Sequence, residues 1–194
     1  MQNTQTATAR LLARLEPIVV GLPQLAEWMH THHIVLTGSF VLQAWYSVEW
    51  PSSDVDFHVL DSVAENIAAA TSPDWLQRVF GPTARPNPAE GVGSPWSSRK
   101  AVSVATAAFT VEISWNHKWI RDPTLSWAML DNFYSPDQGL IVGCLPALRA
   151  KTDKVDIYSE LANRVLAEQR VDYALHRILA RIQRYVDRGF RVVW

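Results

Sequence analysis

The sequence predicts a protein of the α/β (α+β) class, because two kinds of apolar spacing occur in separate parts of its 194 residues. Toward both ends of the chain, apolar residues recur three and four positions apart, which is typical of amphipathic helices. In the middle, several segments alternate apolar and polar residues at every second position, which is typical of half-buried strands. A hydrophobic content of 48% at this length is enough for a proper core.

The first half of the chain contains clear boundaries between these segments. In order, we expect helices over residues 8–16 and 22–30, a strand over 33–37, a helix over 40–46, a strand over 54–60, and helices over 62–70 and 75–80. Gly21 and Pro23 separate the first two helices, and Asp61 or Ser62 is expected to cap the helix over residues 62–70.

The second half begins with a long loop, expected over residues 81–98 because Gly, Pro, Asn and Ser are frequent there. Further on, we expect paired strands over residues 101–106 and 109–115, a short strand over 140–143, and helices over 146–166 and 170–188. Residues 116–138 show no interpretable pattern. The expected organisation is a core over residues 1–144 and a helical C-terminal part over residues 145–194 packed on it.

Charge is distributed unevenly along a chain whose formal net charge is -1. Residues 1–150 contain nine basic and thirteen acidic residues, whereas residues 151–194 contain nine basic and six acidic ones. Any nucleic acid must therefore bind a local basic surface. Cys144 is the only cysteine, which excludes an internal disulfide. Because there is no signal core and no long apolar stretch, we expect a cytoplasmic protein without a membrane partner. The oligomeric state stays open.

Three acidic residues form a candidate metal site. Asp54 and Asp56 lie two positions apart in an expected strand, so their carboxylates point to the same face, and Glu112 is a third acid on another strand. Such hard oxygen ligands suit magnesium, which binds through one or two carboxylates together with water and substrate phosphate. The alternative is a solvated sheet face without a metal.

Gly38 and Ser39 lie where a buried strand is followed by a helix. Backbone N–H groups and the helix dipole favour a phosphate at such a point, and glycine permits its close approach. The alternative is that Gly38 makes a tight turn and Ser39 caps the helix.

At these residues the sequence resembles the nucleotidyltransferase fold of the DNA polymerase β superfamily. The resemblance is carried by Leu36-Thr37-Gly38-Ser39-Phe40, Ser53-Asp54-Val55-Asp56-Phe57 and Val111-Glu112-Ile113. It implies a mixed sheet flanked by helices, and magnesium held by the three acids. It also implies that Gly38, Ser39 and Ser53 bind a nucleoside triphosphate, whose nucleoside monophosphate is transferred to an acceptor.

The C-terminal part is similar to the AbiEii-type toxins of type IV toxin-antitoxin systems. The similar segments are Leu145-Pro146-Ala147-Leu148-Arg149-Ala150-Lys151 and Arg170-Val171-Asp172-Tyr173-Ala174-Leu175. This similarity implies that Lys151 contacts phosphates, that Asp172 helps to shape the site, and that a cognate antitoxin exists. Asp153 and Asp156 compete with Asp172 for the late acidic position, and no basic residue precedes Ser53.

The acceptor implied by the resemblance is an RNA end, with tRNA favoured. The last expected helix gives an independent indication of an RNA acceptor. Its arginines recur at steps of four, three and four, so they share one face. They are Arg177, Arg181, Arg184 and Arg188, extended by Arg170. A basic face without acids favours phosphate contacts, although it can also be a solvated helix face. Transfer to a protein side chain or to a small molecule such as an aminoglycoside is an alternative. A catalytically silent domain that binds RNA or protein is another.

Four histidines, His58 and the set His30, His32 and His33, are further candidate site residues. His58 shares the acidic face of its strand, where it can act near the acceptor or be a hydrogen-bonded neighbour. A surface cluster is the favoured interpretation for His30, His32 and His33, because no acid or cysteine lies at ligand spacing.

Overall fold

The computed structural model describes residues 4–50, 54–60, 63–86, 99–106, 110–116, 131–135, 140–144, 151–154 and 171–193. Its centre is a mixed seven-stranded sheet with the strand order β3-β4-β5-β2-β1-β7-β6. These strands are β1 (Ile34–Thr37), β2 (Val55–Val59), β3 (Arg85–Pro86), β4 (Arg99–Ala105), β5 (Thr110–Asn116), β6 (Asp131–Ser135) and β7 (Leu140–Cys144). Strands β1 and β2 are antiparallel, whereas β2 pairs with β5, and β1 with β7, in parallel. The mixed α/β class expected from the sequence is confirmed.

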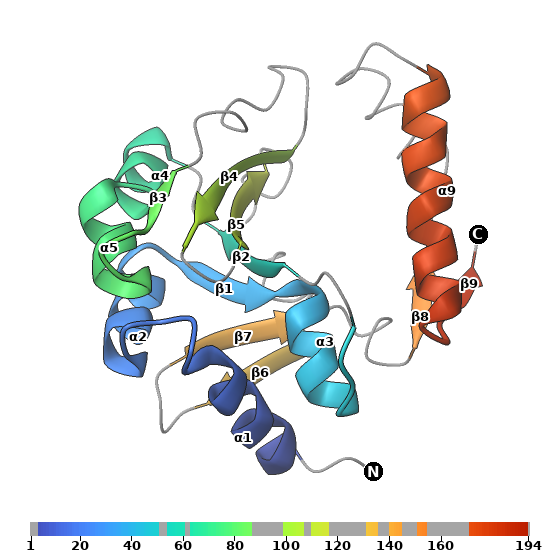
Figure 1. Ribbon diagram of the computed structural model, residues 1–194, viewed down its shortest axis with the longest axis horizontal. Coiled ribbons are helices and arrows are strands. Elements are labelled where there is room, and N and C mark those ends of the chain that lie inside the picture. Colours follow the sequence, from blue (N-terminus) through green and yellow to red (C-terminus); the bar gives the residue numbers. More distant parts are fainter. Residues whose placement is uncertain are drawn as a thin grey trace.

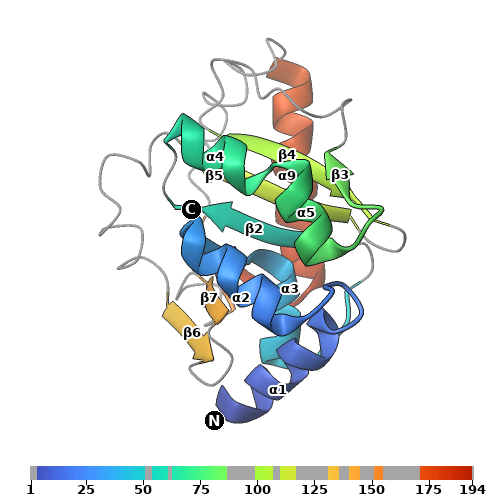
Figure 2. The ribbon, with the colours of Figure 1, turned by 90° about the vertical axis from the view of Figure 1, so that its left-hand side faces the viewer.

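Helices lie on both sides of this sheet. The helices of the described residues are α1 (Thr4–Leu15), α2 (Leu22–Thr31), α3 (Gly38–Tyr46), α4 (Ala64–Ala70), α5 (Pro73–Phe80) and α9 (Val171–Asp187). Figures 1 and 2 show α2, α4 and α5 on one side of the sheet and α9 on the other. None of the helices in the described part of the chain has the length and apolarity needed to cross a membrane.

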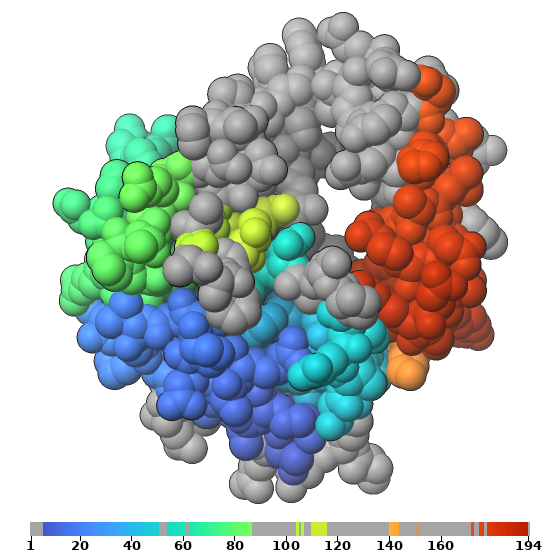
Figure 3. Space-filling view, in the orientation of Figure 1, coloured from blue at the N-terminus to red at the C-terminus, as the bar shows by residue number. Residues whose placement is uncertain are grey.

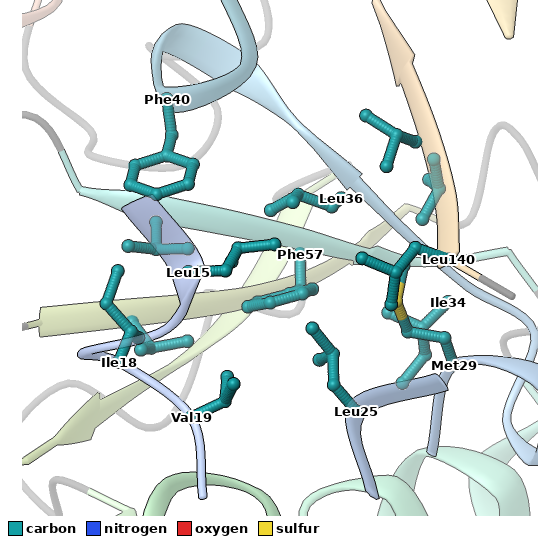
Figure 4. Close-up of a cluster of buried hydrophobic side chains, with 14 of the residues drawn as sticks. Leu15, Ile18, Val19, Leu25, Met29, Ile34, Leu36, Phe40, Phe57 and Leu140 are labelled. Atoms are coloured by element: carbon teal, nitrogen blue, oxygen red, sulfur yellow. The ribbon is translucent and has the colours of Figure 1, made fainter. Parts of the chain in front are cut away.

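The main core lies between the sheet and α2 and α5. Trp28 of α2 meets Phe57 of β2 and Phe80 of α5 edge-on, with ring centroids 5.2 and 5.5 Å apart, and all three rings are buried. Figure 4 shows Ile34 and Leu36 of β1 with other members of the same cluster. Because side chains alternate along a strand, Asp56 points away from this core, toward the opposite face of the sheet.

Several elements expected from the sequence are confirmed, with ends that differ by one or two residues. The expected strands over residues 101–106 and 109–115 form the antiparallel pair β4 and β5, and the short strand expected over 140–143 is β7. The cap of α4 differs from the expectation: Val63 occupies the N-cap position without a side-chain hydrogen bond, and Asp61 and Ser62 lie outside the described residues.

The helix expected over residues 146–166 is wrong at residues 151–154. Lys151 lies in a turn with φ +54°, and Thr152–Lys154 forms strand β8, which pairs in parallel with β9 (Arg191–Val193). A left-handed residue ends any right-handed helix, and the backbone hydrogen bonds of this segment are made across the two-stranded sheet instead. The C-terminal part is therefore not purely helical. The rest of the expected helix lies outside the described residues.

Candidate active site

The expected site residues of the core lie at one edge of the sheet. Strand β1 ends at Thr37, α3 begins at the next residue, and Thr37 is paired with Asp56 of β2. Asp56 is in turn paired with Glu112 on the neighbouring parallel strand β5. Because paired residues of adjacent strands point to the same face about 4.8 Å apart, the carboxylates of Asp56 and Glu112 lie side by side. Both side chains are half-buried.

Gly38 is in direct contact with the Asp56 carboxylate. Its φ is +78°, and a Cβ at this position would overlap the carboxylate oxygen and lie 2.7 Å from the Asp56 Cγ. Only glycine fits here, since any side chain requires both a strained backbone and displacement of Asp56. The carboxylate thus lies at the N-terminal end of α3, where the positive end of the helix dipole favours an anion.

The remaining expected site residues of this edge differ in exposure, and one of them lies outside the described residues. Asp54 is exposed directly before the first residue of β2, and Ser39 is half-buried in the first turn of α3. Ser53 lies outside the described residues. The structure therefore brings together Gly38, Asp56 and Glu112, with Asp54 two residues from Asp56 on the same strand end.

His58 lies on the same face as Asp56, one row further along the strand. Its Nδ1 is 3.1 Å from the hydroxyl oxygen of Ser114, its register partner on β5, and this hydroxyl is also 3.4 Å from the Phe57 carbonyl oxygen. His58 is therefore a hydrogen-bonded neighbour of the acidic residues, which is one of the two interpretations that the sequence allows. Of the other histidines, His30 and His33 are exposed as expected. His32 is instead buried and hydrogen-bonded to Asn66, so it does not belong to a surface cluster.

The donor atoms at this edge fit magnesium chemically. Asp56 and Glu112 supply neighbouring carboxylate oxygens, and one or two carboxylates are what magnesium takes from proteins. In the part of the chain that the structure describes, however, no group of three His, Cys, Asp or Glu side chains is close enough to hold one ion. Asp54 is therefore not gathered with Asp56 and Glu112 into a complete three-acid site, and its ligation of magnesium stays a prediction.

Helix α3, which presents Gly38 and Ser39, is fixed by α1. The Arg10 guanidinium of α1 donates from Nε to the Ala44 carbonyl at 2.7 Å and from Nη2 to the Trp45 carbonyl at 3.2 Å. These carbonyls belong to the last turn of α3, where no intrahelical donor remains and a cation is favourable. This role of Arg10 was not predictable from the sequence, since the bonded residues are 34 and 35 positions apart.

A buried glutamine links α1, α3 and the segment that leads to β2. The side-chain oxygen of Gln43 accepts from Arg14 at 3.1 Å and from the Trp50 backbone N–H at 2.8 Å. Gln43 is almost fully buried, so its amide is a fixed point that holds residue 50, four positions before Asp54. No motif or spacing in the sequence singles out Gln43 for this role.

The structure places Lys151 at the other end of α3. Its backbone N–H donates to the Tyr46 hydroxyl at 3.2 Å, and its Nζ lies 5.1 Å from the centre of the Tyr46 ring. Tyr46 is the last residue of α3 and Gly38 the first, so the two ends are about 12 Å apart at 1.5 Å per residue. The phosphate contact implied for Lys151 stays a prediction, and the structure does not bring this side chain to Gly38 and Asp56.

Asp172 is exposed in the first turn of α9. The backbone carbonyl of Lys151 accepts from Arg191, beyond the C-terminal end of the same helix. A helix of 17 residues is about 24 Å long, so Asp172 does not position Lys151 by direct contact. Asp153 has no described side chain, and Asp156 lies outside the described residues.

No protein-family model, curated protein or solved structure was found to match this chain.

The two faces of α9 are unequally buried. On its apolar face, Ile178 is buried and Ile182 is half-buried, whereas Leu175, Leu179 and Val186 are exposed. On the basic side, Arg184 is exposed, whereas two arginines are half-buried over aromatic rings: Arg181 lies over Tyr185 and Arg188 over Trp50. Within the described residues, the apolar stripe of α9 is thus only partly buried, and two arginines of the basic side also contact the protein. The side chain of Arg177 is not described, and Arg170 lies outside the described residues.

Proposed function

We propose that this protein is a magnesium-dependent nucleotidyltransferase, whose reaction takes place at the sheet edge formed by Gly38, Asp56 and Glu112. The observation that carries the proposal is the contact of the Asp56 carboxylate with Gly38 at the start of α3, next to Glu112 on the adjacent strand. This arrangement joins a phosphate-binding helix terminus to a pair of metal-binding carboxylates.

The roles of the residues follow from their chemistry. The first backbone N–H groups of α3, at Gly38 and Ser39, would bind phosphate oxygens of a nucleoside triphosphate. Asp54, Asp56 and Glu112 would hold magnesium, which neutralises the charge of the triphosphate and of the departing pyrophosphate. In the transfer, the acceptor hydroxyl forms a bond to the α-phosphorus, and the bond from that phosphorus to pyrophosphate breaks.

The placement of the carboxylates favours a metal site over a simple solvated sheet face. Asp56 and Glu112 are half-buried and paired across adjacent strands, so two metal-binding groups lie on the same face. Both groups could contribute to holding a magnesium ion. The same pair argues against a catalytically silent domain, which has no need of adjacent acids beside a glycine-lined helix terminus.

For the acceptor, we propose an RNA end, with tRNA favoured, and a toxin that has a cognate antitoxin. This part rests on the resemblance of the sequence, together with the basic residues of α9. The alternatives are a protein side chain and a small molecule such as an aminoglycoside.

One experiment separates these possibilities. The purified protein is incubated with magnesium and each α-labelled nucleoside triphosphate in turn, with total RNA, total protein or an aminoglycoside as acceptor. Label on RNA supports the proposal in full, whereas label on protein or aminoglycoside supports the reaction and replaces the acceptor. Absence of label from every acceptor with all four triphosphates contradicts the proposed function.

A further inference from the structure

A compact aromatic cluster joins the C-terminal elements to the far end of α3. Its centre is Phe190, which is buried between α9 and β9. The Phe190 ring centre lies 6.0 Å from Tyr46, 6.0 Å from Trp50 and 5.0 Å from Tyr185. Figure 3 shows the C-terminal residues, in red, directly against the residues of α3, in cyan. Two segments far apart in the sequence, residues 46–50 and 185–190, thus meet at this cluster.

Cations line the rim of the cluster. Lys151 Nζ is 5.1 Å from the Tyr46 ring centre, and the Arg188 guanidinium carbon is 4.5 Å from that of Trp50. Arg184 is exposed one turn before Arg188 on α9. We call Tyr46, Trp50, Lys151, Arg184 and Arg188 the junction surface.

These cations are not neutralised by described carboxylates. Within the described ranges, Arg78 pairs with Glu27 on α5 and α2, but Lys151, Arg184 and Arg188 form no ion pair. The nearest acid on α9, Asp187, accepts a hydrogen bond from Gln183. The junction surface is therefore positively charged in a protein whose net charge is slightly negative.

The surroundings of the Arg188 guanidinium favour an anionic ligand. Burial lowers the pKa of its guanidinium, because a partly desolvated site disfavours the charged form. A phosphate beside the guanidinium would offset this cost, and a guanidinium stacked on an indole keeps N–H groups free at its rim to donate to phosphate oxygens.

We propose that the junction surface binds a single-stranded nucleic acid, with phosphates on Arg184, Arg188 and Lys151 and bases against the parts of Trp50 and Tyr46 that these cations leave uncovered. Both rings are half-buried, and the cations over them form no ion pair within the described residues. Alternation of cations with aromatic faces is the means by which single strands are bound without sequence preference. An acidic protein segment would use the cations but has no bases to stack on these rings.

The inference rests in part on the proposed function, since it names where the acceptor strand would lie. The junction surface is at the end of α3 opposite Gly38, about 12 Å away along the helix axis. A strand bound there can extend its end toward the carboxylates at the other end of the helix.

The test measures binding of a labelled single-stranded RNA of about ten nucleotides by fluorescence anisotropy at several salt concentrations. Arg184→Gln removes an exposed cation that makes no described contact, so folding is preserved. The matched control is Arg85→Gln, an exposed arginine on β3. Losing one phosphate contact lowers the salt slope by about 0.7, which at 0.1 M salt weakens binding about fivefold. We expect this for Arg184→Gln and no change for Arg85→Gln.

The double variant Arg184→Gln, Arg188→Gln is expected to bind about 25-fold more weakly at 0.1 M salt, because two contacts are lost. Equal affinity of the wild-type protein and this variant overturns the proposal, and so does failure of the wild-type protein to bind the RNA. Binding of a polyglutamate peptide in place of the RNA overturns it in favour of an acidic protein partner. The same assay with DNA of equal length tells whether the 2′-hydroxyl matters.

The two proposals fail separately. If the wild-type protein binds RNA at this surface but transfers no nucleotide, the proposed function is wrong and the surface stands. If nucleotide is transferred while the double variant binds RNA as the wild type does, the surface is wrong and the function stands.

Discussion

At the scale of single residues, the contact between Gly38 and Asp56 connects the backbone of α3 to the carboxylates of the sheet. Gly38 has a positive φ and no room for a Cβ, whereas Gly81, with φ +97°, has open space around its Cβ position. Comparing alanine substitutions at the two glycines therefore distinguishes two destabilising effects. A positive φ affects both positions, whereas displacement of Asp56 affects only Gly38.

Gly38→Ala and Gly81→Ala should therefore differ in stability and in activity. Gly81→Ala is expected to lower the free energy of unfolding by about 1–3 kcal/mol through backbone strain alone, because Gly81 has φ +97° and ψ 169°. Gly38→Ala should lower it by about 1–3 kcal/mol more, because the methyl group displaces Asp56, and should abolish transfer. Urea denaturation and the labelled-nucleotide assay measure both effects. Equal destabilisation by the two substitutions would show that Asp56 does not lie against Gly38.

Asp54→Asn and Asp56→Asn should both stop nucleotide transfer but should differ in stability. Asp54 is exposed, so its substitution leaves the free energy of unfolding unchanged. Asp56 is half-buried at the N-terminal end of α3, where loss of the negative charge is expected to cost about 0.3–1 kcal/mol. The contact with Gly38 is the reason why only the Asp56 variant is expected to lose stability. Denaturation midpoints of the two variants, measured side by side, decide the matter.

Glu112 and Asp172 should fail in different ways. Glu112 lies beside Asp56 on β5, so Glu112→Gln is expected to raise the magnesium concentration for half-maximal transfer about tenfold or more. Asp172 lies on the first turn of α9, and Asp172→Asn should reduce transfer with an unchanged magnesium requirement. Magnesium titrations of the transfer rate measure both, and a normal magnesium requirement in Glu112→Gln removes this residue from the proposed metal site.

At the scale of elements, α3 depends on α1 for its C-terminal hydrogen bonds. Arg10→Ala should lower the free energy of unfolding by about 1–2 kcal/mol, because the carbonyl oxygens of Ala44 and Trp45 lose a charged donor. Amide hydrogen exchange in the last turn of α3 should become faster, while Arg85→Ala, on the exposed edge strand β3, should change neither quantity by more than about 0.5 kcal/mol. Unchanged exchange in Arg10→Ala would mean that the last turn of α3 is stable without this cap.

The elements of the core were predictable because their apolar spacing is clear. The strict alternation of residues 54–60 predicts β2, and the Ile-Val-Leu run after His33 predicts β1, since both patterns reflect which face is buried. The strand β8 was not predictable, because three residues carry no period and its partner β9 is almost forty residues away. The packing of α9 was not predictable either, since helix period shows which residues share a face but not which face meets the protein.

At the scale of the whole molecule, sheet topology assembles the candidate site from residues that are far apart in sequence. Asp56 and Glu112 are separated by 56 positions, and their adjacency depends on the parallel pairing of β2 and β5. The sequence singled out both acids by residue type and strand face, but it could not show that their strands are neighbours. The same topology places Lys151 at the opposite end of α3, which a linear comparison of motifs could not reveal.

The proposed magnesium-dependent nucleotide transfer is tested most directly by the rate of α-labelled nucleotide transfer by the wild-type protein and by Asp54→Asn, both with magnesium. Asp54 is the best residue for this purpose because it is exposed, so the variant remains folded, and Asp74→Asn on α5 is an exposed control. We predict transfer by the wild-type protein and by Asp74→Asn, and a loss of about 100-fold or more in Asp54→Asn. Transfer at the wild-type rate by Asp54→Asn, or no transfer by the wild-type protein to any acceptor tested, would contradict the account.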